Sequence, residues 1–144
     1  MSRGVRRFIA VSAVFAVIAA APAAADPLGM WSTPGGKAKV RISACGSALC
    51  GSIVALREPA DASGKPKLDI NNTDAAKRAR PIVGRSLLSG MRPAGERWTG
   101  QIYNPEDGKT YTAYMTPQGD GTLRIEGCAL AGLICKTHIW TPAD

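Results

Sequence analysis

The sequence predicts an all-β fold, a small antiparallel up-and-down β-barrel of about eight strands with one long polar loop. Three observations lead to this prediction. Short runs rich in β-branched and aromatic residues recur along the chain, each bounded by turn residues. No helical periodicity of useful length interrupts them. The four cysteines fall into two closely spaced pairs, as expected for hairpins closed by disulfides. Strands joined in this way commonly close into a barrel, which removes the exposed edges.

The first segment, residues 1–25, has the features of a secretory signal peptide. Its basic start contains Arg3, Arg6 and Arg7. An apolar run follows over 8–20, and the small residues 23–25 come just before Asp26. The run is shorter than the roughly 20 residues of a membrane span. We expect cleavage before Asp26, a mature barrel domain over 26–144 in the periplasm or secreted, and no stable membrane insertion; an uncleaved N-terminal anchor is the alternative.

The charge of the mature chain argues against a nucleic-acid partner. The full chain carries +7, but removing the three arginines of the signal leaves 15 basic residues against 11 acidic ones, a net charge of +4. The basic residues are scattered, apart from Lys77, Arg78 and Arg80. A nucleic-acid-binding surface would require a basic stripe with stacking aromatics. We interpret these charges as a solvated surface.

Cys45, Cys50, Cys128 and Cys135 indicate disulfides, because an even count in a small exported domain is typical of them. Three pairings are available. The short spacings favour two local bridges, Cys45–Cys50 and Cys128–Cys135, each across a hairpin. A zinc site built from four thiolates is the competing interpretation. Neither pair has C-x-x-C spacing, and an oxidising compartment disfavours it, so we expect no metal and no cofactor.

Residues 97–117 read as a central β-hairpin, since β-branched and aromatic residues flank a turn at 104–108. In that turn Pro105 presets φ, and Gly108 accepts a positive φ. Side chains alternate across a strand, so Trp98 and Ile102 share one face while Tyr103 lies on the other. Because both faces carry aromatics, the hairpin should have an occupied inner face and a partly covered outer one.

The other strands are expected over 29–33, 39–44, 51–56, 122–127 and 134–141, with an apolar stretch over 81–88 before the hairpin. Prolines, glycine and Asp/Asn residues break the pattern over 58–80 and predict a long polar loop. One short helical turn is expected within 73–80, capped by Thr73 or Asn72. A loop this long in so small a domain is usually functional or mobile.

Trp31, Trp98 and Trp140 are each the bulkiest residue of their own strand. In a closed meander the first and last strands are neighbours. We therefore predict that Trp31 and Trp140 lie near one another at the seam, that Trp98 approaches from the other side, and that Trp31 is largely buried. In a two-sheet sandwich, the alternative, the first and last strands need not touch.

Several motifs together carry a family resemblance. They are Gly29-Met30-Trp31, CGSALCG at 45–51, Asp69-Ile70-Asn71, Arg80-Pro81-Ile82-Val83-Gly84, WTGQIYNPEDGKTYTA at 98–113 and Ile139-Trp140-Thr141. With them the chain resembles the bacterial family called domain of unknown function 2147. The resemblance implies an exported lipocalin-like (calycin-like) β-barrel and says little about ligand or activity. In lipocalins the tryptophan of the G-x-W motif packs against an arginine from a late strand, for which Arg124 is the candidate.

Catalytic motifs are missing from the sequence. His138, the single histidine, sits within a predicted strand, where a surface or hydrogen-bonded role is more common than that of a catalytic base. No G-x-S-x-G elbow, P-loop or dinucleotide fingerprint occurs. We assign no catalytic residue and expect the protein not to be an enzyme.

Two groups of residues are candidates for ligand binding. Asp69, Asn71 and Arg80 bring a carboxylate, an amide and a guanidinium onto one loop, where a charge-assisted network would either order the loop or contact a ligand. The second group consists of Tyr103, Tyr111 and Tyr114, which either line a cavity or pack within the fold.

Three classes of function remain. The first is a periplasmic binding module for a small apolar or amphipathic ligand, which a large apolar cavity would favour. The second is an envelope protein-interaction module or hydrolase inhibitor using its loops, which a filled barrel with an ordered protruding loop would favour. The third, the least expected, is an enzyme, for which a cleft with strongly shifted pKa values would be the sign.

Overall fold

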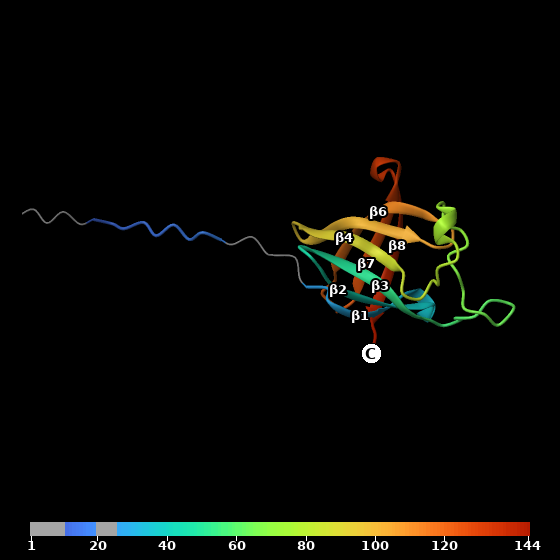
Figure 1. Ribbon diagram of the computed structural model, residues 1–144. Coiled ribbons are helices and arrows are strands. Elements are labelled where there is room, and N and C mark those ends of the chain that lie inside the picture. The colour runs from blue at the N-terminus through green and yellow to red at the C-terminus, as the bar shows by residue number, and fades with distance from the viewer. Residues whose placement is uncertain (1–10, 20–25) are drawn as a thin grey trace, which may run out of the picture.

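The computed structural model describes residues 11–19 and 26–144, and it confirms the predicted architecture. Eight antiparallel strands follow one another in chain order around a closed barrel (Figure 1). Arg3, Arg6, Arg7 and residues 23–25 lie outside the described residues, so the signal peptide and its cleavage site stay predictions. In the part of the chain that is described, no helix has the length and apolar character needed to cross a membrane.

The strands are β1 (Gly29–Ser32), β2 (Ala38–Cys45), β3 (Ala48–Leu56), β4 (Ser86–Ala94), β5 (Arg97–Asn104), β6 (Lys109–Pro117), β7 (Leu123–Ala129) and β8 (Ile134–Pro142). Three short 3₁₀ turns accompany them: η1 (Pro34–Gly36), η2 (Ala75–Lys77) and η3 (Leu130–Gly132). The barrel closes where β1 pairs with β8, at Trp31–Pro142 and Ser32–Thr141. This pairing excludes the two-sheet sandwich.

Apolar side chains fill the interior of the barrel. The core cluster draws on strands all around the wall and consists of Val40, Ile42, Leu49, Leu88, Met91, Ala113, Met115, Leu123, Ile125 and Trp140. Inward-facing glycines make room for these side chains. A Cβ on Gly100 would lie only 2.6 Å from the Met91 sulfur, and one on Gly51 only 3.2 Å from Leu88. Side chains that pack this closely occupy the interior of the barrel themselves, as expected for a small eight-stranded barrel.

The predicted seam is confirmed by the β1–β8 pairing, but the most buried tryptophan is Trp140 rather than Trp31. Trp140 is only 3% exposed, whereas Trp31 and Trp98 are partly buried and pack against the core cluster. The prediction that Trp31 is largely buried therefore holds only in part. Trp31 lies on β1, which has only four residues and pairs with β8 at only two positions, so the wall around this side chain is incomplete. The Trp31 indole N–H donates to the Pro27 carbonyl at 2.8 Å.

Arg124 does not take the place that lipocalin resemblance suggested for it, so that prediction was wrong. Its neighbours Leu123 and Ile125 point into the core, and alternation sends Arg124 to the outer face. There its guanidinium pairs with Glu126 at 3.1 Å. Trp31 packs against the core cluster on the inner side of the wall.

Both predicted disulfides are confirmed. Cys45–Cys50 crosses the β2–β3 hairpin with a Cα–Cα distance of 5.8 Å, and Cys128–Cys135 crosses the β7–β8 hairpin with a Cα–Cα distance of 4.1 Å. Each bridge therefore closes one hairpin and leaves its connecting turn exposed.

The long loop spans residues 57–85 and is longer than predicted, because 81–85 belong to it rather than to β4. The Ile82 N–H donates to the Lys67 carbonyl, and Leu68 bridges to Pro81, so the start of this stretch pairs within the loop. The helical turn forms as η2, but its cap is Asp74 rather than Thr73 or Asn72. The Asp74 carboxylate accepts the Ala76 N–H at 3.0 Å.

Candidate functional site

The long loop is fastened to the barrel by a buried carboxylate. Asp69 is only 1% exposed, and its two oxygens accept separate hydrogen bonds. The Tyr103 hydroxyl donates to Oδ1 at 2.6 Å, and the Asn72 amide donates to Oδ2 at 2.8 Å. A buried charge is tolerated when hydrogen bonds compensate its lost hydration, and both hydrogen bonds to this carboxylate are charge-assisted. Tyr103 reaches Asp69 because it lies on the outer face of β5, opposite the inward Ile102.

Burial and this contact together raise the pKa of the Tyr103 hydroxyl. Burial, followed by the hydrogen bond and the negative charge of Asp69, raises the pKa of Tyr103 to about 12. Tyrosine is protonated at neutral pH in any case, and the raised pKa extends the range in which the hydroxyl donates to Asp69 to pH values above 10.0.

A second anchor joins the loop to the turn between β5 and β6. The Asn71 amide donates to the carbonyls of Pro105 and Glu106, each at 3.1 Å. Gly108 has a φ of +71°, and a Cβ at this position would collide with the Asn71 carbonyl. The backbones of loop and turn thus fit against each other only because residue 108 has no side chain. Pro105 and Gly108 shape both the turn and its docking surface.

Arg80 does not join the predicted network through its side chain. Its backbone carbonyl accepts the Asp69 N–H at 2.8 Å, while its guanidinium has no hydrogen bond or ion pair within the described residues. The network that forms consists of Asp69, Asn72 and Tyr103, together with Asn71 on the turn. Its evident role is to order the loop, one of the two roles expected from the sequence.

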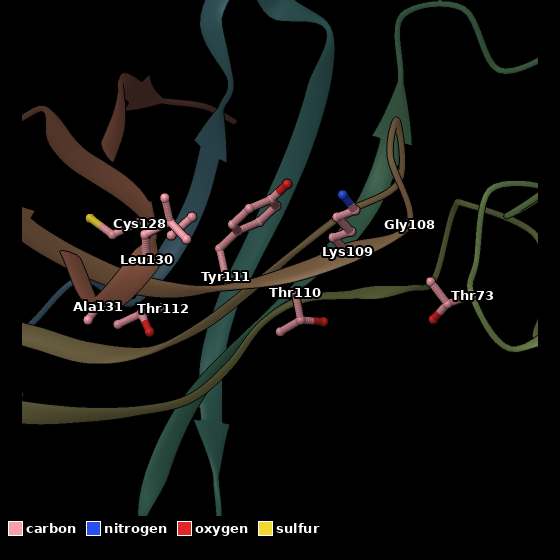
Figure 2. Close-up of a pocket in the computed structure, with 10 residues that line it drawn as sticks. Thr73, Gly108, Lys109, Thr110, Tyr111, Thr112, Cys128, Leu130 and Ala131 are labelled. Carbon is pink, nitrogen blue, oxygen red and sulfur yellow. The ribbon is translucent and has the colours of Figure 1, made fainter. Parts of the chain in front are cut away.

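Two adjoining hollows lie on the outside of the barrel. The loop hollow, of about 360 Å³, lies between the long loop and β5–β6 and includes Lys77, Arg80 and Arg85 in its lining. The tip hollow, of about 610 Å³, reaches along β6 to Leu130 and Ala131 of η3. Figure 2 shows it, with Thr73 entering from the loop. The two share Thr73, Gly108 and Thr110.

The predicted tyrosines occupy different places. Tyr103 lines the loop hollow and Tyr111 the tip hollow. The Tyr111 hydroxyl donates to the Asp107 carboxylate; this bond lowers the pKa of Asp107 and raises the pKa of Tyr111. Tyr114 lies under the Arg97 guanidinium, 3.8 Å from the ring centroid. These positions suit local packing and place no two of the tyrosines in one hollow.

The tip of the β7–β8 hairpin is a feature that sequence reasoning missed. Leu130, Leu133 and Ile134 are 66%, 83% and 58% exposed, and the hairpin projects beyond the rest of the barrel (Figure 1). Leu130 and Ala131 have φ values of +51° and +56°, which residues other than glycine rarely adopt. The available signal was the apolar run between Cys128 and Cys135, where a turn normally carries polar residues.

The other candidates give no site. His138 is exposed on β8. Within residues 11–19 and 26–144, no cluster of three or more His, Cys, Asp or Glu side chains could hold a metal ion.

Comparison with known proteins agrees with this geometry. Protein HP1028 from the human pathogen Helicobacter pylori, described as belonging to the lipocalin family, is structurally similar with a TM-score of 0.71. It is 22% identical, and the similarity covers 83% of this chain and 84% of that one. No curated protein matches the sequence. A family model matches residues 29–142, nearly the whole barrel, and the chain therefore belongs to the family described as "Uncharacterized protein conserved in bacteria (DUF2147)".

Proposed function

We propose that this protein is an exported interaction module, which binds an envelope protein through the apolar tip of its β7–β8 hairpin. The observation that carries the proposal is a side-chain-filled barrel combined with a protruding apolar tip. A carrier of the usual barrel type needs an interior cavity, whereas a rigid barrel with an exposed apolar projection is suited to contact with a partner.

The energetics of the tip support this proposal. Burying a fully exposed leucine side chain contributes about 1.5–3 kcal/mol, and Leu133 is 83% exposed. The Cys128–Cys135 bridge restrains the tip before binding, which reduces the entropy lost on association. Leu130 and Ala131 hold a left-handed backbone conformation that costs about 1–3 kcal/mol per residue, and such strain is common at functional positions.

Export is supported by the two disulfides, the bacterial family and the signal-like residues 1–25. A lipocalin-like fold is typical of binding proteins rather than enzymes, and the family itself has no characterised activity. The partner is accordingly sought among proteins of the bacterial envelope.

The test compares Leu133→Ser with Val54→Ser in the source bacterium. Both replace an exposed apolar side chain by serine, but Val54 lies on β3, outside the tip. Cross-linking followed by quantitative mass spectrometry should identify a protein bound by the wild type and by Val54→Ser. Leu133→Ser should bind it about 10- to 100-fold more weakly. Equal binding by both variants would contradict the proposal. If the partner is a hydrolase, its activity in the presence of the wild type will reveal inhibition.

A small amphipathic ligand is the second candidate, because the lipocalin-like fold is associated with small hydrophobic ligands. Support for it is the mixed lining of the tip hollow, to which Tyr111, Leu130 and Lys109 contribute. Displacement of a fluorescent fatty-acid analogue tests it. Saturable binding that is lost in Leu130→Ser would favour this function, and binding that only denatured protein shows would exclude it.

A further inference from the structure

We propose that the loop hollow binds an oxyanion, the phosphate or carboxylate group of a small soluble molecule. This inference goes beyond the proposed partner binding and uses a different surface. It starts from the charges that line the hollow, which are Lys77, Arg80 and Arg85 against Asp69 and Asp74.

The two carboxylates are already engaged. Asp69 accepts hydrogen bonds from Tyr103 and Asn72, and Asp74 lies 3.8 Å from the Lys77 ammonium. Within the described residues, neither Arg80 nor Arg85 has an ion pair. Three basic side chains against two carboxylates give the lining a net charge of +1, with two guanidinium groups that no described carboxylate pairs with. Arginine's planar fork matches the oxygens of phosphate and carboxylate groups.

Arg85 supplies the stronger argument. Its Nε–H is buried, yet no acceptor bonds to it in the described part of the chain. Folded proteins rarely leave a buried donor unpaired, and a charged donor without an acceptor is especially unfavourable. An oxyanion in the hollow would supply that acceptor, and the neighbouring Thr110 hydroxyl would add a further donor.

The fold holds the backbone of Arg85 in place before any ligand arrives. The Ile53 N–H donates to the Arg85 carbonyl at 2.9 Å, and the Gly84 N–H donates to the Ile53 carbonyl at 2.7 Å. These bonds tie residues 84–85 to β3, while the Asp69–Tyr103 contact holds the opposite wall. A preformed site loses less entropy on binding. Its volume, about 360 Å³, lies within the range of small-molecule sites.

The experiment is a titration of the oxidised protein with inorganic phosphate at constant ionic strength, followed by backbone amide chemical shifts. We expect saturable shifts at residues of the loop hollow. Arg85→Gln and Arg80→Gln should each weaken binding about tenfold or more, since each removes a charge-assisted hydrogen-bonding group. Arg92→Gln is the control: it removes the same charge from an exposed arginine that bonds to Ser47, outside the hollow.

The outcomes separate this proposal from its alternatives. Because Arg80 is exposed, Arg80→Gln gives a result even if Arg85→Gln does not fold. Absence of saturable shifts with phosphate and with succinate would overturn the proposal and leave water as the partner of Arg85. If Arg92→Gln weakened phosphate binding equally, the effect would come from the net charge of the protein and not from a site in the loop hollow, which would overturn the proposal. Binding to phosphatidylglycerol vesicles without binding to phosphate or succinate would overturn the proposal of a soluble ligand. The hollow would then bind lipid headgroups at a membrane surface. Leu133→Ser should bind phosphate normally, so failure of the partner proposal would not affect this one.

Discussion

Replacing Gly108 by alanine should detach the long loop from the barrel. Gly108 has a φ of +71°, and the added Cβ would collide with the Asn71 carbonyl. The turn cannot accommodate both the methyl group and the loop backbone, so the loop must move. Movement would break the bonds from the Asn71 amide to Pro105 and Glu106.

The magnitude follows from a comparison with Gly95→Ala. Gly95 also has a positive φ, +67°, but its Cβ would meet nothing within 4 Å. Both variants lose about 1–2 kcal/mol for a left-handed alanine. Gly108→Ala additionally loses two hydrogen bonds of about 0.5–1.5 kcal/mol each. We therefore expect Gly108→Ala to destabilise the protein by about 1–3 kcal/mol more than Gly95→Ala does.

Urea unfolding of the oxidised proteins measures this difference, provided that the slope of the transition stays unchanged. Limited trypsin digestion gives an independent measure, since Lys67, Lys77 and Arg78 lie in the loop. Cleavage there should accelerate in Gly108→Ala and not in Gly95→Ala. Equal stability losses with equal cleavage rates would refute the docking of the loop on this turn.

Three further predictions concern the barrel and its anchors. Trp140→Ala should cost about 3–5 kcal/mol of unfolding free energy in urea melts, and Trp31→Ala less, because only Trp140 is fully buried; a reversed order would contradict the packing. Raising the pH from 10.0 to about 12 should destabilise the wild type relative to Tyr103→Phe, because Tyr103 ionises at lower pH in the unfolded chain than in the folded one. Thermal melts across this range check the sign. Melting temperatures that fall in parallel for the two proteins would disprove it. Replacing both Cys128 and Cys135 by serine should cost roughly 2 kcal/mol and weaken partner binding, and intact binding would show that the bridge does not preorganise the tip.

The barrel was predictable because its signals are local. Alternation placed Val40 and Ile42 inside, and the spacing of Cys45 and Cys50 predicted their bridge. Turn chemistry identified Gly108 as a position of positive φ. Each of these inferences needs only residues that are close in sequence.

The site was less predictable because it depends on contacts between distant segments. Asp69 and Tyr103 are 34 residues apart, and no local pattern announces that they meet. The cap of η2 moved to Asp74 because the Asn72 side chain is used elsewhere: its Oδ1 accepts the Asp74 N–H, and its Nδ2 donates to Asp69, whose place is set by the distant Tyr103. Arg85 carries no sequence signal at all, because its importance comes from a buried Nε–H without an acceptor.

Native mass spectrometry of the protein purified from the envelope of its source bacterium tests the central claim most directly, because it reports protein partners and small ligands together. A filled barrel that acts through its outer surface predicts a complex with a second protein, lost in Leu133→Ser and kept in Val54→Ser. A stoichiometric apolar ligand retained by both variants, with no protein partner, would contradict it.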